Sequence, residues 1–174
     1  QVEACNGGQK SVATETTTNM YKRNDSPGHD MIAAHNGSFF HTSTTDATGV
    51  GMSRMGLICN GELIQNPIGG WPMFVLTHDR VPYFEEVNFS SSITSSNGAS
   101  NRIHTFNTHF LELDAVDDNG ERMMMFTREY GTKTNNASGG TKVILVPNEG
   151  DFTTTPNMTV KCTVESIFDN TGAS

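Results

Sequence analysis

The feature that most constrains the fold is the dipeptide Asn60-Gly61, because it stands between two short apolar runs. Residues 55–59 precede it and residues 62–65 follow it. Asn-Gly readily adopts the positive φ angles of a tight two-residue turn, so apolar runs on both sides predict a β-hairpin. We therefore expect a fold in which neighbouring strands pair antiparallel.

Further strand signals follow the same pattern of short apolar runs and turns. A second hairpin is predicted for residues 73–77 and 81–86, turning through His78-Asp79-Arg80, with Pro82 at a strand start or edge. The remaining predicted strands are residues 30–35, 102–106, 110–116, 122–127, 142–146 and 158–168. Residues 41–53 and 89–101 are rich in small polar residues and are predicted to be loops.

One helix is expected early in the chain, over residues 10–23, although the threonines at 14–18 disfavour it. The sequence Ser26-Pro27-Gly28 would end it. The predicted fold class is therefore α+β: β-rich, with mostly antiparallel hairpins and one early helix. A chain of 174 residues fits a single domain over 1–174.

The charge balance excludes some classes of partner. Lys plus Arg total 11 and Asp plus Glu total 19, which gives a net charge of −8. Without a basic run, the chain is a poor candidate for nucleic-acid binding, and no apolar run approaches the length of a membrane span. Abundant Thr, Ser, Asn and Gly are typical of exported (periplasmic, cell-surface or secreted) β-rich proteins. Because the chain begins at Gln1, we expect an upstream segment to have been removed.

Metal and cofactor sites are not expected. The three cysteines, Cys5, Cys59 and Cys162, are far apart and lack the spacing of a zinc site. They allow one disulfide with one free thiol, but three buried thiols are the favoured reading. The acidic turn at 117–120 does not fit a calcium-binding loop, because carboxylates or amides are missing at the required positions.

The stretch of residues 31–40 allows two interpretations. An apolar run ends at Asn36-Gly37, and Phe39 and Phe40 follow almost at once. The first interpretation is a buried strand that leads into a tight turn, with both phenylalanine rings in the core. The second is a site loop that presents Asn36 and its neighbouring backbone amides to a substrate.

Three blocks, taken in order, resemble the phosphodiester glycosidase family, which includes the lysosomal uncovering enzyme and bacterial relatives. Residues 33–40 (AAHNGSFF) are similar to the family's Ala-Ala-Ile-Asn-Gly-x-Phe-Phe. Residues 56–63 (GLICNGEL) are similar to its Gly-Leu-x-x-x-Gly-x-Leu hairpin. Residues 106–108, 122–130 and 132–139 are similar to its Asn-containing strand, its apolar strand ending in Tyr and its Thr-x-Thr-Asn loop. The resemblance covers most of the chain from about 30 to 170.

The chain also departs from the family pattern. His35 replaces an aliphatic residue, and His109 stands where the family commonly has Arg. The family's later Pro-Arg-Thr and Asp-Gly-Gly-Gly-Ser segments do not occur before Ser174. We therefore expect this chain to represent the N-terminal part of an incomplete phosphodiester glycosidase-like domain.

The resemblance implies hydrolysis of a sugar-1-phosphodiester to free sugar and a phosphomonoester. Such a site needs a carboxylate, donors for sugar hydroxyls and donors for phosphate oxygens, because an oxocarbenium-like centre must be stabilised. Glu112 is the candidate carboxylate, and His109, with His35 and His41, is a candidate for acid–base roles. The candidate substrate-binding residues are Asn36, Gly37, Ser38, Phe40, Thr132, Thr134 and Asn135, with Lys133 as a possible positive charge.

Each of these residues also has a structural interpretation. Glu112 could be an outward-facing charge on an alternating strand, Asn36 could cap a turn, and the residues around Thr134 could form an exposed loop. The alternative function, from a different class, is a non-catalytic exported β-rich module that binds glycans or a cell-envelope polymer.

Overall fold

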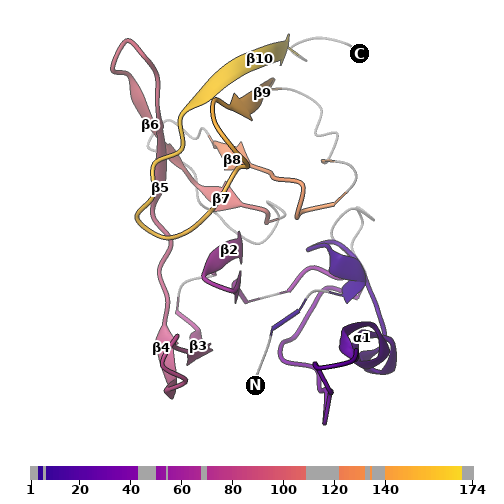
Figure 1. The fold of residues 1–174 in the computed structure, drawn as a ribbon. Helices are drawn as coiled ribbons and strands as arrows, with labels where there is room; N and C mark the ends of the chain where they lie inside the picture. The colour runs from indigo at the N-terminus through magenta and orange to yellow at the C-terminus, as the bar shows by residue number, and fades with distance from the viewer. Residues whose placement is uncertain are drawn as a thin grey trace.

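The computed structural model describes residues 4–5, 7–42, 50–53, 55–67, 70–108, 122–131, 134 and 140–169. Its described strands form two-stranded sheets, and one short α-helix lies near the N-terminus (Figure 1). The helices are η1 (Gly7–Gln9) and α1 (Thr17–Asn24). The strands are β1 (Leu57–Cys59), β2 (Glu62–Gln65), β3 (Pro72–Leu76), β4 (Pro82–Glu86), β5 (Ser91–Thr94), β6 (Ser100–Ile103), β7 (Thr105–Phe106), β8 (Met124–Met125), β9 (Thr141–Pro147) and β10 (Cys162–Asp169). The prediction of a β-rich chain with antiparallel hairpins and one early helix is confirmed at this level.

The hairpin around Asn60-Gly61 forms as predicted. Strands β1 and β2 pair antiparallel, with Cys59 opposite Glu62. Asn60 has φ 52° and Gly61 has φ 82°, so both turn residues adopt the left-handed conformation that a tight hairpin turn requires. The turn therefore has the conformation that its two residues predict.

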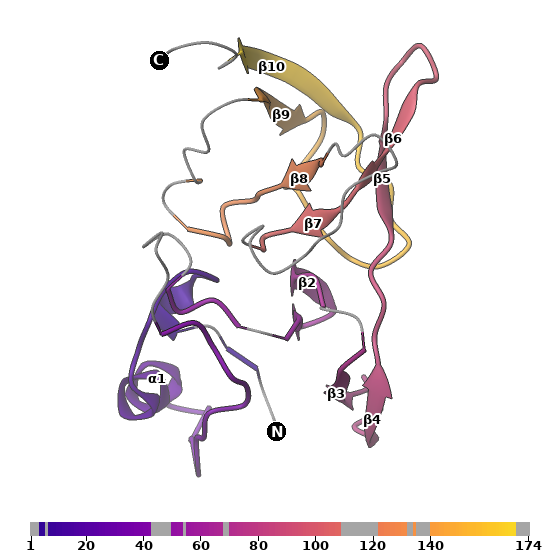
Figure 2. The same cartoon turned by 180° about the vertical axis from the view of Figure 1, so that it is seen from behind.

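The second predicted hairpin also forms, from β3 and β4. Its turn closes through a backbone hydrogen bond of 2.9 Å from Arg80 N to Thr77 O. Pro82 is the first residue of β4, as expected for a residue without a backbone N–H. In both views the hairpin projects away from the strands at the centre of the molecule (Figures 1 and 2).

The last hairpin consists of the two longest strands, β9 and β10. The predicted strand at 142–146 is confirmed and is extended by one residue at each end. The predicted strand at 158–168 begins later, at Cys162. The register shifts between Val164 and Ser166, which marks a β-bulge.

The prediction of a loop over residues 89–101 is wrong, because β5 and β6 form a hairpin there. Ile93 pairs with Asn101, and the turn contains Gly98 at φ 88°. These strands carry mainly Ser, Asn and Thr, so the apolar alternation by which strands are recognised is missing. Backbone pairing, the Asn97-Gly98 turn and polar side-chain contacts such as Thr94 Oγ1 to Ser100 Oγ, over 3.1 Å, hold the hairpin together.

The strand predicted at 102–106 is divided, and its second part, β7, pairs with β8 in parallel rather than antiparallel. His104 separates β6 from β7, and Met123 N–H donates to its Nδ1 over 3.0 Å. The predicted return strand at 122–127 is reduced to Met124–Met125. The predicted strand at 110–116 and the acidic turn at 117–120 lie outside the described residues.

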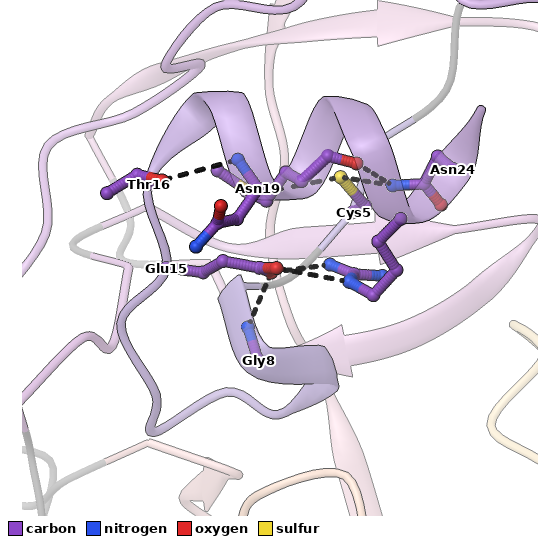
Figure 3. A network of polar contacts seen from close by, with 8 residues as sticks. Cys5, Gly8, Glu15, Thr16, Asn19 and Asn24 are labelled. Atoms are coloured by element: carbon purple, nitrogen blue, oxygen red, sulfur yellow. Dashed lines mark hydrogen bonds and ion pairs between the residues drawn. The ribbon is translucent and has the colours of Figure 1, made fainter.

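The helix is shorter than predicted and begins after the threonine cluster. Thr16 is its N-cap, and the Thr16 Oγ1 accepts a hydrogen bond of 3.2 Å from Asn19 N (Figure 3). Threonine is a favourable capping residue but a poor helix former, so the helix starts where the cluster supplies a cap. The helix ends before Ser26-Pro27-Gly28, as predicted.

The predicted strand at 30–35 is wrong. Residues 30–37 have no regular secondary structure, and Ile32 is 96% exposed. Phe39 and Phe40 are also exposed, which contradicts the interpretation that places both rings in the core. An apolar run becomes a strand only when another strand pairs with it, and none of the described strands does so.

The described core is small and unusually polar. Its buried apolar side chains are Met52, Ile64, Ile103, Phe106 and Tyr130. Its buried polar side chains are Ser11, Gln65, Asn66, His104, Thr105, Asn107 and Thr108. Most of these residues belong to β2, to β7 or to the residues beside them, so the core lies where these two strands meet.

The prediction of three buried thiols is wrong. Cys5 is exposed, and Cys59 and Cys162 are partly exposed. Within the described part of the chain, no helix is long and apolar enough to cross a membrane.

Candidate functional site

The stretch Asn36–Phe40 is an exposed segment that is attached to the core at one end. Asn36 and Gly37 are exposed, and a β-carbon placed on Gly37 would meet nothing within 4 Å. The side chain of Phe40 is 41% exposed, while its backbone forms an antiparallel bridge with Ser53. The segment therefore presents an amide side chain and an aromatic ring to solvent.

The attachment continues through His41, whose backbone forms two further hydrogen bonds. His41 N donates to Met52 O over 2.9 Å, and Gly51 N donates to His41 O over 2.8 Å. Met52 is 1% exposed and belongs to the core. These bonds hold the C-terminal side of the exposed segment in place and leave Asn36 and Gly37 accessible.

Hydroxyl and amide groups link this segment to the β1–β2 hairpin. The Oγ atoms of Ser38 and Ser53 lie 2.9 Å apart, within hydrogen-bond distance. Gln65, the last residue of β2, donates from its Nε2 to Ser53 O over 2.6 Å. Gln65 is 1% exposed, so this bond lies in the core. The exposed segment is thus joined to a buried polar cluster.

Within that cluster, Asn66 connects β2 to β7. Its backbone N donates to Phe106 O over 3.0 Å, and its Oδ1 accepts from Phe106 N over 2.8 Å. The same Oδ1 accepts a hydrogen bond of 2.6 Å from the Thr108 hydroxyl. Asn66 and Thr108 are buried, and each of these bonds satisfies a group that would otherwise be costly to bury.

Asn107 connects β2 to the chain that follows β8. Its Nδ2 donates to Ile64 O and to Thr127 Oγ1, each over 2.8 Å. Its Oδ1 accepts from Thr127 N over 2.7 Å. The backbone of Asn107 has φ 50°, a conformation that Asn tolerates better than most residues. One fully buried side chain therefore joins two distant segments.

The remaining predicted site residues fall mostly outside the described part of the chain. His109, Glu112, Thr132, Lys133 and Asn135 lie there, so their predicted roles stay predictions. Thr134 is described and exposed.

His35, the other candidate for an acid–base role, is exposed, and its Nδ1 lies 3.1 Å from Asn36 O. The ring of His35 therefore stands beside the Asn36 backbone, at the accessible end of the segment. His41 contributes to the attachment through its backbone, as described above.

The structural role of Asn66 and Asn107 was not predicted from the sequence. Both are amides next to strands, and their buried environment is set by contacts across the fold. Their side chains satisfy backbone groups on other segments, so the cluster holds these segments together.

The described residues contain no group of three or more His, Cys, Asp or Glu side chains that could hold a metal ion. Comparisons with known protein families, with curated proteins and with solved structures give no match for this chain.

Proposed function

We propose that this chain forms part of a hydrolase that cleaves a sugar-1-phosphodiester to free sugar and a phosphomonoester. The single observation that supports the proposal best is a polar connection that joins the first and third sequence blocks and passes through residues on either side of the second block. Hydrogen bonds link Ser38 to Ser53, Ser53 to Gln65, and Asn66, the next residue, to Phe106. Asn107, which follows Phe106, then bonds to Thr127 in the chain after β8. Blocks that are distant in sequence but meet around one buried cluster are what a shared site requires.

In the proposed site, the exposed segment binds the sugar. The Asn36 side chain and the Gly37 backbone donate hydrogen bonds to sugar hydroxyls, and the open space at Gly37 admits the ligand. Phe40, which is partly exposed, packs against the apolar face of the sugar ring. Thr134, with the flanking Thr132 and Asn135, donates to phosphate oxygens.

The chemical step is assigned to residues that follow the buried cluster. Thr108 is fixed by its hydrogen bond to Asn66, and His109 follows it directly in the chain. In the proposal, Glu112 stabilises the oxocarbenium-like centre or acts as the nucleophile. His109 provides a positive charge or a proton close to the phosphate. The leaving phosphate is a weak base, so charge stabilisation contributes more than protonation of the leaving oxygen.

The proposal is tested by sugar release from a sugar-1-phosphodiester by the full-length protein. We expect Asn36→Ala to raise KM roughly three- to tenfold, because one hydrogen bond of about 1 kcal/mol is lost. Asn101→Ala is the matched control, since Asn101 is an exposed amide on β6, outside the proposed site. Unchanged kinetics for Asn36→Ala would show that this segment does not bind the sugar.

A second candidate function, glycan binding without catalysis, is favoured by the exposed aromatic residues of the β3–β4 hairpin. Phe74 and Phe84 pack edge-to-face with ring centroids 5.6 Å apart, yet 53% and 75% of their surface is exposed. Trp71 stands directly before β3 and is also exposed. Such rings bury apolar sugar surface without needing ordered loops.

The two functions are separated by the variants that affect them. Trp71→Ala and Phe84→Ala should weaken binding to an immobilised glycan. If the hydrolase proposal holds, both variants should still release sugar at the unaltered rate. If the full-length protein releases no sugar and these two variants abolish glycan binding, the result would support glycan binding and exclude the hydrolase proposal.

A further inference from the structure

Two cysteines that are far apart in sequence lie next to each other in the fold. The Cys59 Sγ, on β1, donates a hydrogen bond of 3.2 Å to the carbonyl oxygen of Ala4. That carbonyl belongs to the peptide bond that joins Ala4 to Cys5. The Cys59 sulfur therefore contacts the backbone from which the Cys5 side chain extends.

The Cys5 thiol faces helix α1. It lies 4.0 Å from Met20 Sδ and 3.8 Å from Asn24 Nδ2 (Figure 3). Electrostatics also indicate that the two cysteines are close. Burial, which is the largest cause, and the negative charges of Cys5 and Glu129 together raise the pKa of the Cys59 thiol to about 11.

The third cysteine has a different environment. Cys162 is the first residue of β10 and pairs with Pro147 of β9. In Figure 1 this hairpin lies at the top, away from α1. Of the three possible pairings, the fold therefore favours the one between Cys5 and Cys59.

We propose that Cys5 and Cys59 form a disulfide when the protein meets a small-molecule disulfide such as oxidised glutathione. The exposed Cys5 thiolate attacks one sulfur of glutathione disulfide, forms a mixed disulfide and releases one glutathione thiolate. Cys59 then attacks the Cys5 sulfur, its proton passes to solvent, and the second glutathione leaves as a thiolate. In sum the protein loses two protons and two electrons, and glutathione disulfide takes them up to become two glutathione thiols.

The bond would attach the N-terminal segment to the β1–β2 hairpin. Closure removes two thiol hydrogen bonds, from Cys59 to Ala4 O and from Cys5 to Met20 Sδ. The Cys5 charge that raises the pKa of Cys59 also disappears once Cys5 is in the mixed disulfide, which makes the second step easier. This inference is independent of the proposed hydrolase function.

The test is a redox titration of the full chain in glutathione buffers, followed by intact mass and a non-reducing peptide map. We expect the loss of two hydrogens, one peptide pair joined through Cys5 and Cys59, and Cys162 open to alkylation. The Cys162→Ser variant should give the same linked pair, whereas Cys59→Ser should stop as a glutathione adduct on Cys5.

Three results would overturn the inference. The first is a stable glutathione adduct on Cys5 in the unaltered protein, which would mean that Cys59 cannot reach it. The second is a linked pair that contains Cys162. The third is the absence of any intramolecular link in a buffer that oxidises exposed thiols.

Discussion

Replacing Asn107 by Ala should destabilise the protein more than any exposed asparagine substitution does. The Asn107 side chain is completely buried and satisfies Ile64 O, Thr127 N and Thr127 Oγ1. Its removal leaves the buried Ile64 O and the partly buried Thr127 N without this partner, at about 1–3 kcal/mol each. An alanine in the left-handed region adds about 1–2 kcal/mol. We therefore expect the free energy of unfolding to fall by about 3–8 kcal/mol.

The matched control is Asn157→Ala. Asn157 has φ 64°, close to the φ of 50° at Asn107, but it is exposed. It should lose only the backbone contribution, about 1–2 kcal/mol. Urea unfolding followed by circular dichroism measures both variants. Equal losses for the two variants would refute the reasoning, because they would show that the buried hydrogen bonds of Asn107 add nothing.

Two further predictions concern close packing and pH. A β-carbon on Gly56 would lie 2.6 Å from the Pro67 backbone, so Gly56→Ala should lower the midpoint of thermal unfolding. Gly37→Ala, at an open position, should leave that midpoint unchanged. Equal midpoints for the two variants would contradict the close approach of Gly56 to Pro67. The hydrogen bond from Arg23 lowers the pKa of Glu15 below its ordinary value of 4.5. A lowered folded-state pKa stabilises the protein above the unfolded-state value and loses this effect as pH falls through the folded-state value. Urea unfolding should therefore show less acid destabilisation in Glu15→Gln below pH 4.5, and parallel pH profiles would exclude this contribution.

The parts of the fold that could be predicted are those determined by local chemistry. Asn60-Gly61 specifies its turn through the backbone preferences of two residues, and Pro82 marks a strand start because it lacks an N–H. The hairpin of β5 and β6 was not predicted, because its strands are polar and its pairing comes from the backbone. At residues 30–35 a strand was predicted because the run is apolar, but none of the described strands pairs with it.

The candidate site was predictable only in part. Asn36 and Gly37 were identified through the turn-like dipeptide, and the structure leaves both accessible. Asn66 and Asn107 were not recognised as a buried cluster, because their partners lie on segments distant in the sequence. An amide within a strand-like run, as in Phe106-Asn107-Thr108, is the one local signal that could have indicated burial with specific hydrogen bonds.

The most direct test of the proposed function is sugar release from a sugar-1-phosphodiester by the full-length protein and its Glu112→Gln variant. Glu165→Gln is the control, because Glu165 is an exposed carboxylate on β10. We predict that the unaltered protein and the control release sugar and that Glu112→Gln is slower by about 10²-fold or more. Absence of sugar release from the unaltered protein, or equal rates for both variants, would contradict the proposal.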